Sequence, residues 1–93
     1  MLTSAQRKDL KARAHSLEPV VIIGGKGLTV EVVAEIDRAL KSHELIKVRA
    51  PSVERLERAQ VFAAICEKTG CEAVQQVGKV FVLFRKRDEP AES

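Results

Sequence analysis

Residues 20–29, VVIIGGKGLT, join a run of four aliphatic side chains to three glycines and a lysine. The β-branched run is too short for a helix and predicts a strand that is buried on both faces. Thr29 is a favourable helix N-cap, so we expect a helix to begin there. The glycines between them then form a strand-to-helix turn, which is a common place for a phosphate group to bind.

A helix is predicted over residues 3–17, before this strand. Thr3 and Gln6 have the spacing of a capping box. The apolar stripe of this helix comprises Leu10, Ala14 and Leu17. The residue before Pro19 disfavours helical backbone angles, so the helix ends before the strand begins.

The helix that starts at Thr29 is expected to bury Val33, Ile36 and Leu40. The next strand, residues 45–50, alternates between core and solvent. Its apolar side chains are Ile46, Val48 and Ala50, and its basic ones are Lys47 and Arg49. The alternation predicts a strand with one wet, basic face.

A third helix is expected from Pro51-Ser52 to about Thr69, where Gly70 stops it. Its expected core residues are Ala59, Phe62, Ala63, Ile65 and Cys66. Two strands, 72–77 and 80–84, follow and are joined by a two-residue turn at Gly78-Lys79. The predicted class is therefore α/β in the order αβαβαββ, with a four-stranded mixed sheet packed with helices. The crossover helices imply parallel neighbouring strands.

The 93 residues suit one domain, which we place at residues 1–87, with a frayed tail at 88–93. No apolar run approaches the roughly 18 residues that a membrane span needs. The first residues lack the apolar core of a secretory signal, so we expect a cytoplasmic protein with no membrane partner. Its two cysteines are then expected to remain thiols, buried or half-buried.

Three phosphate-binding motifs compete for the glycine turn. A Walker loop fails because Val20 stands where its first glycine is needed, and a dinucleotide fingerprint fails because Val30 replaces its third glycine. The remaining motif is Gly-x-x-Gly, formed by Gly24, Gly25, Lys26 and Gly27. This is the spacing by which KH-type modules clamp a nucleic-acid backbone. The alternative is a structural turn that needs a positive φ.

Longer segments favour the nucleic-acid interpretation. The opening LTSAQRKDLKARAHSLEPVVIIGGKGLT, the string ALKSHELIKVR and the closing TGCEAVQQVGKVFVLFRK resemble, in this order, the bacterial YhbY-like family, the stand-alone form of the CRM domain. The resemblance covers about residues 3 to 87. It implies a small RNA-binding fold similar to the C-terminal domain of a bacterial initiation factor. It also implies association with precursors of the large ribosomal subunit, with residues 24–27 as the RNA clamp. Pro51 departs from the family pattern and puts the start of the third helix in doubt.

Other basic residues are candidates for a wider RNA surface. They are Lys8 and Lys11 with His15 on the first helix, Lys47 and Arg49 on the second strand, and Arg85, Lys86 and Arg87 after the last strand. A solvated helix face is the alternative for the first group. Protection of an exposed sheet edge is the favoured alternative for Lys47 and Arg49. With three phenylalanines and no tyrosine or tryptophan, recognition is expected to depend on RNA backbone and shape.

The residues predict a non-enzymatic RNA-binding protein, and the resemblance implies that it assists assembly of the large ribosomal subunit. No catalytic residue, metal site, cofactor or small-molecule substrate is expected. Two alternatives stay open, a nucleotide-binding enzyme that uses the same turn and a protein-interaction adaptor that uses the acidic second helix.

Overall fold

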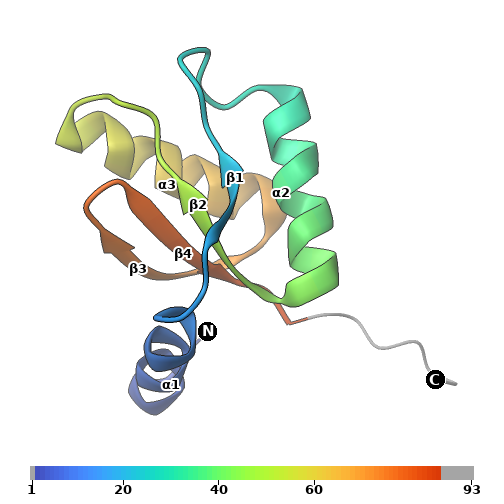
Figure 1. Ribbon diagram of the computed structural model, residues 1–93, viewed down its shortest axis with the longest axis vertical. Helices are drawn as coiled ribbons and strands as arrows, with labels where there is room; N and C mark the ends of the chain where they lie inside the picture. Colours follow the sequence, from blue (N-terminus) through green and yellow to red (C-terminus); the bar gives the residue numbers. More distant parts are fainter. Residues whose placement is uncertain (1, 87–93) are drawn as a thin grey trace, which may run out of the picture.

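The computed structural model describes residues 2–86 as three helices and one four-stranded mixed sheet. The elements are α1 (Ser4–Ala14), β1 (Pro19–Ile22), α2 (Val30–His43), β2 (Leu45–Arg49), α3 (Arg55–Thr69), β3 (Glu72–Val77) and β4 (Val80–Phe84) (Figure 1). This order confirms the predicted class. Arg87 and the expected tail at 88–93 lie outside the described residues. Within residues 2–86, no helix has both the length and the apolar character to cross a bilayer.

The strand order is β1-β2-β4-β3, with β1 parallel to β2 and β4 antiparallel to both of its neighbours. The prediction that each crossover joins neighbouring strands is therefore wrong for α3, because β4 lies between β2 and β3. The hairpin accounts for this order. Its turn at Gly78, where φ is 58°, folds β4 back into the sheet. The sequence VFVLF gives β4 apolar residues for both faces, as an interior strand requires.

The main core lies between one face of the sheet and helices α2 and α3. Ile36 and Leu40 of α2 are fully buried against Val48 on β2 and Phe81 on β4. Phe62 of α3 stacks on Phe81 with ring centroids 4.4 Å apart. Burial of these side chains supplies most of the apolar driving force for folding.

A smaller core holds α1 against the opposite face. Leu10 and Ala14 pack with Leu45, Val74 and Val82. The guanidinium of Arg7 donates to the backbone carbonyls of Ala73 and Val74, where the β3 register is irregular. Figure 1 shows α1 beneath the lower end of the sheet, so part of this face stays uncovered.

Three predicted helix boundaries are confirmed. Thr3 and Gln6 form the capping box of α1, with N–H donors 2.8 and 3.0 Å from the side-chain oxygens. Thr29 accepts a hydrogen bond from the Val32 amide at 3.1 Å and caps α2. Gly70 ends α3 in the left-handed conformation at φ 74°.

The predicted start of α3 is wrong by four residues. The helix begins at Arg55, because the segment after Pro51 forms a turn in which the Val53 amide donates to the Pro51 carbonyl at 3.0 Å. Of the five expected core residues, Phe62 and Ile65 are buried and Cys66 is half-buried. Ala59 and Ala63 are exposed, because they lie off the stripe that faces the sheet.

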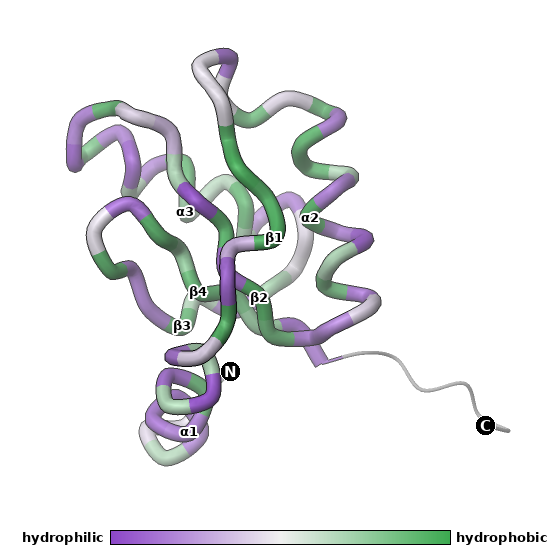
Figure 2. Tube along the Cα trace, in the orientation of Figure 1, coloured by the Kyte–Doolittle hydropathy of each residue, from purple (hydrophilic) through white to green (hydrophobic). Residues whose placement is uncertain are grey.

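The prediction that β1 is covered on both faces is also wrong. Val21 and Ile23 are buried, but Val20 is 47 % and Ile22 66 % exposed. The strand is at an edge of the sheet, and α1 does not extend over it. Figure 2 shows this exposed strand as a continuous hydrophobic segment.

We predict that Leu10→Ala lowers the free energy of unfolding by about 2–5 kcal/mol, because it empties the contact between α1 and the sheet. Leu56→Ala is the matched control, since Leu56 is also on a helix but is 73 % exposed, and it should change stability by less than about 0.5 kcal/mol. Urea unfolding followed by far-UV circular dichroism measures both. Equal effects of the two changes would show that α1 is not packed as described.

Candidate nucleic-acid interface

The Gly-x-x-Gly segment forms a tight turn between β1 and α2, and Figure 1 shows it projecting beyond the sheet. The Gly27 amide donates to the Gly24 carbonyl at 3.0 Å, and the Thr29 amide donates to the Gly27 carbonyl at 3.1 Å. Gly27 has φ 75°, which favours glycine. The structural reason for glycine therefore applies at Gly27, while Gly24 and Gly25 have negative φ or extended backbone.

The amides of this turn are mostly available to a ligand. Among residues 2–86, the N–H groups of Gly24, Gly25 and Lys26 have no hydrogen-bond partner, and all three residues are exposed. The Gly27 amide is not available in the same way, because it closes the turn. A Cβ atom built on Gly24 or Gly25 would meet nothing within 4 Å. Adjacent free amides in such an open turn can bind an anion.

The first turn of α2 adds to this potential. The Thr29 cap uses the Val32 amide, which leaves the amides of Val30 and Glu31 without a partner in the described part of the chain. The positive end of the helix dipole lies here, although Glu31 places one exposed carboxylate in the same turn.

The turn forms one wall of a hollow of about 440 Å³. Further lining comes from Arg49 at the end of β2, from the segment 50–53 that follows it, and from Glu57 and Val61 of α3. The Ile23 amide donates to the Arg49 carbonyl at 3.0 Å, which holds the two strand ends together. The hollow thus combines Lys26 and Arg49 with a single carboxylate, so its lining carries an excess of positive charge.

The structure brings only some of the predicted basic residues to this part of the molecule. Arg49 borders the hollow, whereas Lys47 lies further along β2, facing Lys11 and His15 of α1 across a second groove. Lys8 is exposed on α1 and lines neither of these two spaces. The edge-protection interpretation of Lys47 and Arg49 is wrong, because β2 is an interior strand.

Arg85 and Lys86 lie at the other end of α2. The Arg85 amide donates to the carbonyl of Glu44, the residue that ends this 14-residue helix. A helix of that length places them about 20 Å from its N-terminal turn. The structure therefore does not bring these two candidates to the glycine turn.

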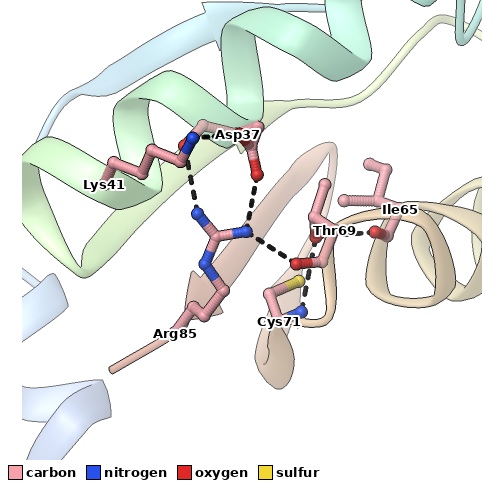
Figure 3. A network of polar contacts seen from close by, with 6 residues as sticks. All are labelled: Asp37, Lys41, Ile65, Thr69, Cys71 and Arg85. Atoms are coloured by element: carbon pink, nitrogen blue, oxygen red, sulfur yellow. Dashed lines mark hydrogen bonds and ion pairs between the residues drawn. The ribbon is translucent and has the colours of Figure 1, made fainter. Parts of the chain in front are cut away.

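The Arg85 side chain instead joins three elements (Figure 3). Its Nη1 atom lies 2.7 Å from Oδ1 of Asp37 on α2 and 2.6 Å from the carbonyl oxygen of Thr69 on α3, and both contacts are hydrogen bonds. Its Nη2 atom donates to the Asp37 carbonyl at 3.2 Å. The hydrogen bond from Arg85, and then that from Lys41, hold the pKa of the Asp37 carboxyl below its usual range.

Three basic residues at the same end of the sheet as the glycine turn were not predicted from the sequence. Arg55 and Arg58 line a further hollow beside Gly78, and the Ala50 amide donates to the Lys79 carbonyl at 2.6 Å. The turn after β1, the segment after β2 and the β3–β4 turn therefore meet at one end of the sheet. This meeting of the three connections follows from the strand directions, because the parallel strands β1 and β2 end at the edge of the sheet where the antiparallel strand β4 begins.

The cysteines are free thiols at the C-terminal end of α3, with Sγ atoms 3.5 Å apart. Cys66 is half-buried and Cys71 is buried, as expected. The hydrogen bond between the two thiols lowers the pKa of Cys71 and raises that of Cys66. The pair lies near the Arg85 network rather than near the glycine turn.

Comparison with known proteins assigns nearly the whole chain to one domain family. The sequence model of the CRS1 / YhbY (CRM) domain matches residues 2–85. A probable RNA-binding protein of Pseudomonas aeruginosa is 40 % identical over 89 residues, which are 96 % of this chain and 86 % of the relative. An RNA-binding protein of Haemophilus influenzae is 43 % identical over 88 residues, 95 % of this chain and 89 % of the relative.

A solved structure gives the same result for the fold. The solution structure of a hypothetical Staphylococcus aureus protein, described as a candidate RNA-binding protein, superposes with a TM-score of 0.84 at 32 % identity. The match covers 99 % of this chain and 96 % of that chain. The expected resemblance to the YhbY-like family is thereby confirmed.

We predict that Asp37→Asn lowers the stability at pH 7 by about 1–2 kcal/mol, because it removes a charged hydrogen bond to Arg85. The lowered pKa of Asp37 means that its contribution is present above pH 3.8, the usual value, and is lost as the pH falls through the folded-state pKa. Urea unfolding from pH 7 to pH 2 should therefore show the wild-type and variant curves converging below about pH 4. Curves that stay parallel would contradict the assigned ion pair.

Proposed function

The chain belongs to the CRS1/YhbY (CRM) domain family, and on this premise we propose that it binds RNA and catalyses no reaction. The names of its relatives support RNA as the ligand. We propose further that the RNA is the precursor of the large-subunit rRNA, that the protein associates with pre-ribosomal particles in the cytoplasm, and that it assists their assembly.

The observation that carries this proposal is the row of free, exposed amides at Gly24, Gly25 and Lys26. Phosphate oxygens accept hydrogen bonds from such amides, and glycine allows the RNA backbone to approach closely. Lys26 and Arg49 add positive charge on either side of the hollow. These groups contact phosphate and sugar rather than base edges, so this contact alone is expected to be weakly sequence-selective.

The neighbouring basic residues extend the same surface. Lys8, Lys11 and Lys47 attract the RNA from the side of α1, and Arg55 at the start of α3 and Lys79 in the β3–β4 turn do so from the same end of the sheet as the glycine turn. Arg58 is left out because its Nη1 atom donates to the Val53 carbonyl at 2.8 Å. Arg85 is left out because it holds Asp37 and Thr69 together. Lys86 is left out because it follows Arg85 at the far end of α2.

We predict that the double change Gly25→Asp with Lys26→Glu weakens binding to large-subunit rRNA about tenfold or more, since it places carboxylates where phosphates bind. Gly25 suits this test better than Gly27, because its Cβ meets open space and its φ is not positive. Filter binding across a salt series should show a smaller dependence on salt for the variant, by about one phosphate contact.

Lys68→Glu is the matched control, because it reverses an exposed charge in the last turn of α3, the end of that helix away from the hollow. It should retain wild-type affinity. A folded double variant that binds rRNA with unchanged affinity and salt dependence would overturn the role of the turn.

The cellular part of the proposal needs its own experiment. UV cross-linking in cells, followed by sequencing of the bound RNA, should recover large-subunit rRNA precursors, and the protein should co-sediment with pre-ribosomal particles. Recovery of protein partners without RNA would favour the adaptor alternative. Micromolar binding of ATP, GTP or NAD in calorimetry would favour the enzyme alternative.

A further inference from the structure

The sheet face that α1 leaves uncovered carries an ordered row of side chains. The strand register aligns Ile22 of β1 with Arg49 of β2, Arg49 with Val80 of β4, and Val80 with Val77 of β3. None of the four belongs to either core cluster. Ile22 is 66 % and Val77 57 % exposed, and Val80 is half-buried, so β1, β3 and β4 present aliphatic side chains in the row while β2 contributes the exposed Arg49.

A groove lies between this row and α1. Its volume is about 460 Å³, and it is lined by Lys47, Val80 and Val82 below and by Lys11 and His15 of α1 at the side. Neither the row nor the groove lining contains a carboxylate. Within residues 2–86, the side chains of Lys11, Lys47 and Arg49 have no ion-pair partner.

The row is continuous with the glycine turn. Arg49 is a member of the row, and both Arg49 and Ile22 also line the hollow beside Gly24–Gly27. A chain held at the turn can therefore run directly onto the open sheet face.

We propose that this open face binds an unpaired RNA segment that continues from the RNA strand held at the glycine turn. The open face comprises Ile22, Arg49, Val80 and Val77 together with the groove that contains Lys47 and Lys11. The inference rests on the proposed function and names the form of RNA that the site takes.

The chemistry of the face selects an unpaired strand. A duplex presents sugar and phosphate on its outside and offers nothing to exposed aliphatic side chains, whereas an unpaired strand exposes the faces of its bases. The bases lie against Ile22, Val77 and Val80, and the phosphates lie near Arg49, Lys47 and Lys11. Phe62 and Phe81 are in the main core, so aliphatic contacts take the place of aromatic stacking.

Positive charge also disfavours a second copy of the chain as the occupant. A symmetric pair would bring the same patch of each copy together and place Lys47 and Arg49 opposite like charges. An anionic ligand with apolar surface matches both properties of the face.

The experiment is an NMR titration of the full chain with two single-stranded uridine oligonucleotides. One has about four nucleotides, the length that a Gly-x-x-Gly loop clamps, and the other has about ten. We expect the short one to shift amide signals of residues 24–31 only. The long one should also shift signals of residues 47–49 and 77–82 and bind about tenfold more tightly. A blunt RNA duplex should leave the signals of residues 77–82 unchanged.

Two variants separate the face from the turn. Val77→Glu should abolish the gain in affinity with length and leave the short oligonucleotide unaffected, and the uncharged Val77→Thr should reduce that gain by a few fold. Ala63→Glu is the control, because it adds the same charge at an exposed position in the middle of α3, away from both this face and the glycine turn. Unchanged amide spectra without RNA show that each variant is folded.

Equal affinity and equal shifts for the two oligonucleotides would overturn the inference. If both oligonucleotides still bind at residues 24–27, the proposed function stands without this inference. If neither oligonucleotide binds, the proposed function and the inference are both overturned. The amide signals of the row residues could instead broaden with protein concentration in the absence of RNA, and Val77→Glu could remove this broadening. That result would assign the face to self-association and would also overturn the inference.

Discussion

The pairing of β2 with β4 is the constraint on which the rest of the structure depends. Their register, from Leu45 opposite Phe84 to Arg49 opposite Val80, directs Ile46, Val48, Phe81 and Leu83 to the main core. Because side chains alternate along a strand, a slip of one residue would exchange the two faces. The same register therefore places Lys47 and Arg49 opposite the main core, where a ligand can reach them.

The charged side chains have different roles at the two ends of the sheet. At one end, three connections bring together basic side chains and unpaired amides, which favour an anionic ligand. At the other, Arg85 uses its guanidinium for Asp37 and Thr69 and holds α2, α3 and the end of β4 together. Arginine is common to both ends, so its position relative to carboxylates and carbonyls, and not its charge alone, determines its role.

Features set by neighbouring residues could be predicted from the sequence, because their physics is local. The caps at Thr3 and Thr29 and the stop at Gly70 are of this kind. Features set by distant residues could not. The insertion of β4 between β2 and β3 and the open face of β1 depend on packing between elements, and the Arg85 contact joins residues 48 positions apart. For the candidate site, the sequence located the turn, but only coordinates reveal that the Gly27 amide is already used. Arg55, Arg58 and Lys79 were missed because their position depends on the strand directions, which place the start of α3 and the β3–β4 turn at the same end of the sheet as the glycine turn.

Both free edges of the sheet are blunted by single side chains described above. At β1, a four-residue strand, Pro19 has no N–H to offer to an incoming strand. At β3, the guanidinium of Arg7 occupies the carbonyls of Ala73 and Val74. Backbone groups at an exposed edge template the growth of aggregates, and a proline or a positive charge there opposes it. Both features therefore oppose strand addition at the edges of a sheet that exposes Val20, Ile22 and Val77.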